Sequence, residues 1–204
     1  MKQALARLVV ACLLAGCGGA PDLDDSKVLD RILAEAIDSR LQERGTGDKK
    51  LKYAPNSEAP YTGWAKELWN NGQVKGLYQL KDGKREGFAT AWHANGQKMA
   101  AGHFRDGKQE DVWIQWHDNG QKQSKGSFKN GRTDGLWTRW YTNGRRATKS
   151  HWMEGRLATI SVWKPDGVKC TETNVMNGNG VAIHYKEDGT AVRFTCMDGV
   201  ETRN

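Results

Sequence analysis

WHDNGQ, residues 116–121, recurs along the chain in near-copies. The copies are WNNGQ (69–73), WHANGQ (92–97), WYTNGR (140–145) and WKPDGV (163–168). Asn-Gly and Asp-Gly pairs favour the positive φ that tight hairpin turns require. A phrase repeated around such pairs at nearly constant intervals therefore predicts a repeat fold, in which the phrase marks one turn of each unit.

Two series of glycines give the period of the repeat. The first series is Gly72, Gly96, Gly120, Gly144 and Gly167, and the second is Gly83, Gly107, Gly131, Gly155 and Gly178. Members of the first series lie 24, 24, 24 and 23 residues apart, and each member of the second follows by 11. Two turns per unit predict one β-hairpin per unit. With a weaker sixth unit through Gly189 and Gly199, residues 61–204 predict an all-β, elongated antiparallel meander of about six hairpins.

Large apolar residues occupy three columns between the turns. The columns are Leu68, Trp92, Trp116, Trp140 and Trp163; Leu80, Phe104, Phe128, Trp152 and Val175; and Trp64, Phe88, Val112 and Leu136. Residues two or four apart in a strand share a face, so the first and third columns are expected to project together as one continuous core ridge. Gly102 and Gly126 are expected to leave room for a neighbouring ring. Trp113 and Trp137 point to the opposite face and are expected to be more exposed.

The N-terminus has the pattern of an export signal. In residues 1–16, two basic residues precede an apolar run that is too short to span a bilayer. Leu14-Ala15-Gly16-Cys17 resembles the lipobox of bacterial lipoproteins, which implies that Cys17 is lipid-modified and begins the mature chain. Gly18 then implies transfer to the outer membrane, with the protein on its periplasmic or surface side. The alternative is an ordinary secretory signal that contains a cysteine.

Residues 17–60 are expected to join this anchor to the repeats. Residues 18–24 suit a flexible tether. Apolar residues at i, i+3, i+4 and i+7 then predict one amphipathic helix over about 25–44. This helix either caps the first hairpin or pairs with another chain. Residues 45–60 are expected to be a linker.

The net charge of +7 falls on the repeats. Such a surface could meet anionic lipid, a polyanionic surface polysaccharide or an acidic protein, or it could simply be a solvated face. Nucleic acid is not expected as a partner of an exported lipoprotein. His93 and His117 occupy equivalent positions in successive units, but no further metal ligands accompany them. Because no nucleophile or acid-base pair is evident either, we expect no enzyme activity, no metal and no cofactor.

Cys170 and Cys196 would be the remaining cysteines of an exported chain, where a disulfide could form. On adjacent hairpins their Cα atoms would be about 9–10 Å apart, beyond the roughly 7 Å that a disulfide spans. The bond therefore requires the terminal hairpin to fold over the array. The sequence leaves both states open.

The segment GLWTRWYTNGRRATKSHWMEGR (135–156) and its copies resemble the bacterial MORN-repeat variant, and the resemblance extends over 61–199. It implies a spacer, a scaffold, or contact with lipid or protein, and some bacterial relatives are labelled antitoxins. We therefore expect a non-enzymatic, membrane-anchored binding or scaffold lipoprotein. Its partner is expected to be a protein or a surface glycan, and the alternative is an immunity or antitoxin-type protein that neutralises a toxin. The expected binding face comprises Trp113, Trp137, Arg139 and Tyr141.

Overall fold

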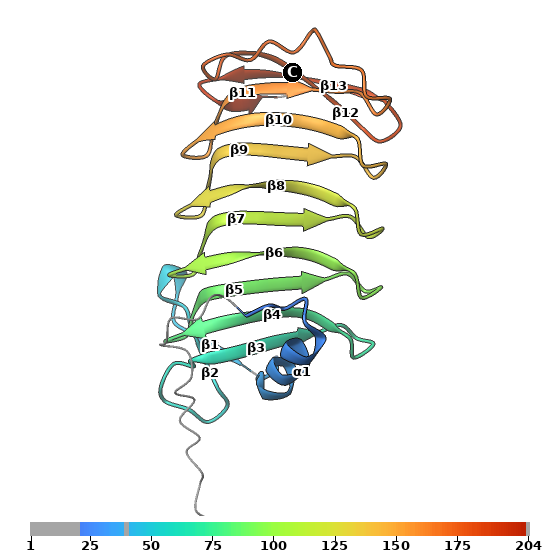
Figure 1. The fold of residues 1–204 in the computed structure, drawn as a ribbon. Coiled ribbons are helices and arrows are strands. Elements are labelled where there is room, and N and C mark those ends of the chain that lie inside the picture. Colours follow the sequence, from blue (N-terminus) through green and yellow to red (C-terminus); the bar gives the residue numbers. More distant parts are fainter. Residues whose placement is uncertain (1–20, 39–40, 203–204) are drawn as a thin grey trace, which may run out of the picture.

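The computed structural model describes residues 21–38 and 41–202. Its main element is a nine-stranded antiparallel sheet in which each strand pairs with its neighbours in sequence (Figure 1). The strands are β3 (Gly63–Leu68), β4 (Val74–Lys81), β5 (Lys84–Trp92), β6 (Lys98–Arg105), β7 (Lys108–Trp116), β8 (Lys122–Lys129), β9 (Arg132–Trp140), β10 (Arg146–Met153) and β11 (Arg156–Val162). The predicted meander of hairpin repeats is confirmed over these strands. The predicted signal peptide (1–16) and Cys17 lie outside the described residues.

The two turn series have different backbones. In the second series both central residues take positive φ, for example +48° at Asp82 and +77° at Gly83, which is the type I′ geometry. In the first series a hydrogen bond of 2.8 Å from the Trp69 N–H to the Gln73 carbonyl closes a longer loop. Only the glycine of that loop, Gly72, has a positive φ, of +83°. The Asn-Gly and Asp-Gly pairs thus fix both kinds of turn.

The sheet is a single layer, so its two faces are separate surfaces. Residues three apart in a strand lie on opposite faces. One face carries Trp113 and Trp137 and is called the Trp113 face. The other carries Trp116 and Trp140 and is called the Trp116 face. Side chains are buried either where another element covers a face or where large rings pack against one another on it.

The expected continuous core ridge is wrong for this reason. Phe104 and Phe128, from the second column, pack around Trp113 on the Trp113 face. The first and third columns lie on the Trp116 face, where Trp92 is buried but Val112 and Leu136 are 47% and 52% exposed. Trp92 is buried under α1, whereas its equivalents Trp116 and Trp140 are only half-buried, so one repeat position is buried to different degrees depending on what lies over it.

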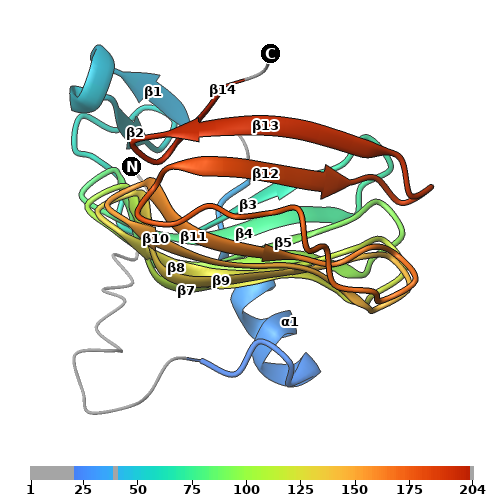
Figure 2. The same cartoon turned by 90° about the horizontal axis from the view of Figure 1, so that it is seen from above.

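Helix α1 (Ser26–Glu35) covers the first units of the Trp116 face (Figures 1 and 2). Asp25 caps the helix, because its carboxylate accepts a hydrogen bond from the Lys27 N–H. The helix buries Ile32 and Ala36 against Leu77 and Trp92. Helix α1 thus caps the first hairpins, which is one of the two expected alternatives. The helix ends at Glu35 rather than near residue 44.

The segment after α1 protects the free edge of β3. The Ile37 N–H donates to the Trp64 carbonyl at 2.9 Å, and the Ile37 carbonyl accepts from Lys66 N–H at 2.7 Å. The expected linker at 45–60 is partly structured, since β1 (Gln42–Arg44) pairs with β2 (Leu51–Tyr53) across a short 3-10 turn (Gly47–Lys49). Unpaired sheet edges invite association, so this cover limits it at β3.

The C-terminal residues leave the meander. A separate sheet of β12 (Gly180–Tyr185), β13 (Ala191–Met197) and β14 (Val200–Thr202) lies over the Trp113 face at the β11 end (Figure 2). The outer edge of β11 is hydrogen-bonded to the Gly178 N–H at 3.0 Å and to the Gly199 carbonyl at 3.0 Å. The expectation of six hairpins in one series is therefore wrong for the last units, which close the array.

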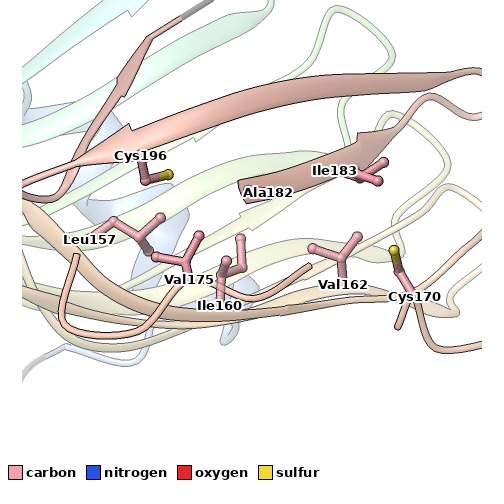
Figure 3. Packing of buried hydrophobic residues seen from close by; sticks show 8 residues of the cluster. All are labelled: Leu157, Ile160, Val162, Cys170, Val175, Ala182, Ile183 and Cys196. Carbon is pink, nitrogen blue, oxygen red and sulfur yellow. The ribbon is translucent and has the colours of Figure 1, made fainter. Parts of the chain in front are cut away.

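Cys170 and Cys196 are both free thiols. They are buried at separate places in the cluster between β11 and the C-terminal sheet, which also contains Leu157, Ile160 and Val162 (Figure 3). The terminal hairpin does fold over the array, as a disulfide would have required, but the two side chains form no crosslink. Both lie in the core, where Cys170 Sγ accepts hydrogen bonds from the Thr173 and Tyr185 hydroxyls.

Candidate functional site

Trp113 is not an exposed binding residue. It is only 7% exposed. Its indole lies directly on Gly102, where an added Cβ would come within 2.3 Å of the ring. The indole N–H donates to the His103 carbonyl at 3.0 Å. The expected exposure of Trp113 is therefore wrong, whereas the expected fit of a ring against glycine is confirmed.

Trp137 repeats this arrangement one unit later. A Cβ on Gly126 would come within 2.1 Å of its ring, and its indole N–H donates to the Ser127 carbonyl at 2.9 Å. Phe128 stands edge-on between the two tryptophans, with centroid distances of 6.3 Å to Trp113 and 5.1 Å to Trp137. Edge-to-face contacts at these distances stabilise a packed ladder. The Trp113 face is thus held together largely by its own rings.

Tyr141 is also a structural residue. It is 4% exposed, and its hydroxyl donates to the Trp163 carbonyl at 2.6 Å. Burial, followed by the charge of Glu187, raises the pKa of Tyr141 to about 12, so the hydroxyl remains a donor at neutral pH. Of the four expected binding-face residues, Tyr141 and Trp113 are therefore excluded by burial.

The position of Tyr141 links the repeats throughout the array. Its equivalents Trp69, His93 and His117 contact the carbonyl of the next unit's tryptophan at 3.2, 3.0 and 3.0 Å. A carbonyl only accepts, so Nε2 of both histidines must carry the proton. Sequence reasoning treated this position as variable. The available signal was that the first four copies place a ring with a polar hydrogen there, whereas the fifth has Lys164.

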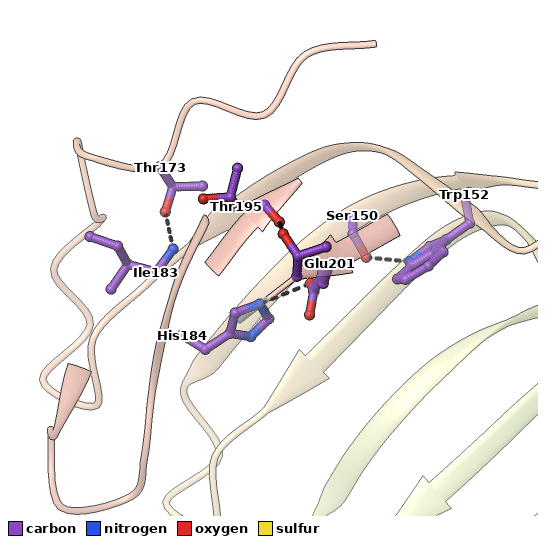
Figure 4. A network of polar contacts seen from close by, with 8 residues as sticks. Ser150, Trp152, Thr173, Ile183, His184, Thr195 and Glu201 are labelled. Carbon is purple, nitrogen blue, oxygen red and sulfur yellow. Dashed lines mark hydrogen bonds and ion pairs between the residues drawn. The ribbon is translucent and has the colours of Figure 1, made fainter. Parts of the chain in front are cut away.

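Trp137 and Arg139 line a cleft between the Trp113 face and the C-terminal sheet. The cleft has a volume of about 310 Å³ and also includes Trp152, His184 and Glu201 among its lining residues (Figure 4). These two members of the expected face therefore do lie together at an accessible place.

Most polar groups of this cleft are engaged with one another. His184 Nε2 donates to Glu201 Oε1 at 3.2 Å, and the Trp152 indole N–H donates to Ser150 Oγ at 2.8 Å. The hydrogen bond from His184, helped by the charges of His184 and Arg139, lowers the pKa of Glu201. The pair joins β12 to β14 and stabilises the C-terminal sheet.

A second accessible surface lies on the Trp116 face from β7 to β10. It carries Trp116 and Trp140 together with the exposed apolar residues Val112 and Leu136. Its basic residues are Lys122, Lys125, Arg146 and Lys149, all of which are exposed. Within the described part of the chain no element packs on this area, because α1 lies over β3 to β5 and the C-terminal sheet lies over the other face. We call this area the open Trp116 surface.

Neither a metal site nor a membrane-spanning helix occurs among the described residues. In 21–38 and 41–202, no group of three histidine, cysteine or acidic side chains is arranged to hold a metal ion. Within the same ranges, no helix has the length and apolar character needed to cross a bilayer.

Comparison with known proteins supports the repeat type. Residues 112–130, from β7 through the turn to β8, match the family model described as the MORN repeat variant. No curated protein matches the chain. A crystal structure of an S. aureus TarM mutant in complex with Fondaparinux, alpha-GlcNAc-glycerol and UDP matches at 7% identity and a TM-score of 0.30. That match covers 65% of this chain and 24% of the other, so the chain spans about a quarter of that protein's length.

Proposed function

We propose that this protein is a non-enzymatic, membrane-anchored scaffold that binds a partner protein through the open Trp116 surface. The supporting observation is the exposure of Val112 and Leu136, at 47% and 52%, on the same face as Trp116 and Trp140. Scattered apolar residues are common on surfaces, but a contiguous patch of large ones bordered by charge is typical of an interaction site. The match to a MORN-type repeat agrees with a repeat-based binding module.

Site-specific photocrosslinking in cells tests this proposal. A photoreactive residue at Val112 or Leu136 is expected to give the same discrete adduct with one protein. The control position is Met197, which is equally apolar and 63% exposed but lies on the C-terminal sheet. If Val112 and Leu136 give no adduct, or if Met197 gives the same one, the open Trp116 surface is not the binding site.

The proposed anchor is a lipid on Cys17, which would attach the protein to the bacterial outer membrane. Two or three acyl chains give durable attachment, since each buried methylene contributes about 0.8 kcal/mol and one chain alone holds weakly. Replacing Cys17 by serine should abolish incorporation of a labelled fatty acid and release the protein from membranes. Continued labelling of the Cys17→Ser variant would exclude this anchor.

A further inference from the structure

Helix α1 shows how the Trp116 face holds a helix. Its apolar side buries Ile32 and Ala36 against Trp92. Just before the helix, Asp24 forms an ion pair with Lys98, which is the cross-strand partner of Trp92 in the hairpin. The face thus offers one tryptophan to the apolar side of a helix and one cation to the acidic residues at its N-terminal end.

This pair of residues recurs in each of the next two units. Trp116 pairs across the hairpin with Lys122, and Trp140 pairs with Arg146, in the register of Trp92 and Lys98. In these units the pair lies on the open Trp116 surface, where Lys122 is exposed and the Arg146 guanidinium stands 5.1 Å from the centre of the Trp163 ring. The features that hold α1 are therefore present twice more.

The spacing allows a second helix beside α1. Strands lie about 4.8 Å apart, so Trp140 on β9 is about 19 Å from Trp92 on β5. Packed helices need only about 8–10 Å between axes. Trp116 and Trp140 are themselves about 10 Å apart, which is close to the diameter of a helix with its side chains. One helix lying between these two tryptophans would touch both of them without disturbing α1.

The charge of the open Trp116 surface indicates the kind of helix. Leu77, which is buried under α1, corresponds to Lys125 and Lys149 in the later units. A helix on the open Trp116 surface would therefore contact lysine side chains at the position where α1 contacts Leu77. An acidic helix is therefore favoured over a purely apolar one.

We propose that the open Trp116 surface binds one amphipathic helix of a partner protein, acidic at its N-terminal end, in the register that α1 adopts two units earlier. This inference rests on the proposed scaffold function and names the class of its partner. The apolar side of the partner helix lies between Trp116 and Trp140, and its acidic residues face Lys122 and Arg146.

The probe for this inference is a synthetic peptide of residues 22–38, which contains α1 and its acidic start. Labelled peptide is titrated into the full chain in detergent. A photoreactive group at its Ile32 position is expected to label the β7 to β10 region. The Trp140→Ser variant should weaken binding about tenfold or more, since burying one such ring contributes about 1.5 to 3 kcal/mol.

Charge reversal keeps the test independent of folding. Lys122 is exposed, so Lys122→Glu should leave the thermal unfolding temperature unchanged while weakening peptide binding severalfold. A peptide with Asp24→Lys and Asp25→Lys should then recover binding to that variant. The matched control is Lys129→Glu, at the far end of the same strand, which should not affect binding.

Two results would overturn the inference. One is a peptide that labels only β3 to β5, where it has exchanged with α1. The other is unchanged affinity for both Trp140→Ser and Lys122→Glu. If the cellular crosslinks from Val112 and Leu136 persist in either case, the scaffold function stands and only the helical partner is wrong. If those crosslinks are absent as well, the proposed function itself fails.

Discussion

Replacing Asp111 by glycine is expected to stabilise the array. Asp111 lies at a bulge in β7 and has a φ of +57°, in the left-handed region. The equivalent residues of the neighbouring units, Gly87 and Gly135, take φ of +84° and +80°. Asp111 therefore adopts a backbone conformation that its neighbours reach with glycine.

The expected gain is modest because two effects oppose each other. The left-handed conformation costs a residue with a Cβ about 1–2 kcal/mol. Glycine relieves this cost in the folded state, but it also raises the entropy of the unfolded chain, which lowers the free energy of unfolding by about 0.4–1 kcal/mol. The Asp111→Gly variant should therefore gain about 0.5–1 kcal/mol. For a chain of this size that corresponds to a rise in Tm of about 1–4 °C.

Gly135→Asp is the matched control. No atom lies within 4 Å of a Cβ built on Gly135, so the substitution tests backbone conformation alone. It should lose about as much as Asp111→Gly gains, and the double variant should return close to the parent stability because the sites are about 10 Å apart. Urea unfolding followed by circular dichroism measures both changes. A lower stability of Asp111→Gly, with an unchanged m-value, would show that the aspartate makes a stabilising contact and would refute this reasoning.

Three further outcomes are expected. Gly126→Ala should lose at least about 2 kcal/mol in urea unfolding, because the indole that lies on it must move, whereas Gly76→Ala, with no neighbour closer than 3.9 Å, should be nearly neutral. Tyr141→Phe should lose about 1–2 kcal/mol in the same assay by leaving a buried carbonyl without its donor. The lowered pKa of Glu201 means that its contribution is present above the ordinary value of 4.5 and is lost as the pH falls through the lower folded value. Glu201→Gln should therefore flatten the loss of stability below about pH 4.5, and an unchanged acid profile would exclude the His184 pair as its cause.

The turns could be predicted from the sequence, but the choice of face could not. Asn119-Gly120 and its copies specify φ locally, so their spacing predicts every hairpin from β3 to β11. Trp113 and Trp116 carry the same local information, since either ring could be core. What buries Trp113 is its packing on Gly102 between Phe104 and Phe128 of neighbouring strands, whereas Trp92 is buried because α1, which lies outside the regular repeats, covers it. Gly102 and Gly126 were the local signals, because a glycine opposite a ring leaves space for the ring to pack.

The candidate site was likewise predictable from the sequence only in part. Arg139 and Trp137 were predicted together and do share the cleft, because residues two apart in a strand keep the same face. Tyr141 was also two residues on, but it falls where the strand enters the turn and there bonds to the next unit. The open Trp116 surface was missed because the residues that form it were predicted to be core.

The bonds from His93, His117 and Tyr141 to the following unit have a consequence for the length of the array. The first four units donate to their successors through the same position, so the junctions between them are chemically alike. A unit of about 24 residues could be duplicated or deleted without leaving an unsatisfied group at the join. The sheet ends at β3 and β11, whose outer edges are hydrogen-bonded to segments outside the regular repeats. Ile37 bonds to β3, and Gly178 and Gly199 bond to β11. The length of such an array can therefore change by whole units while its two ends remain the same.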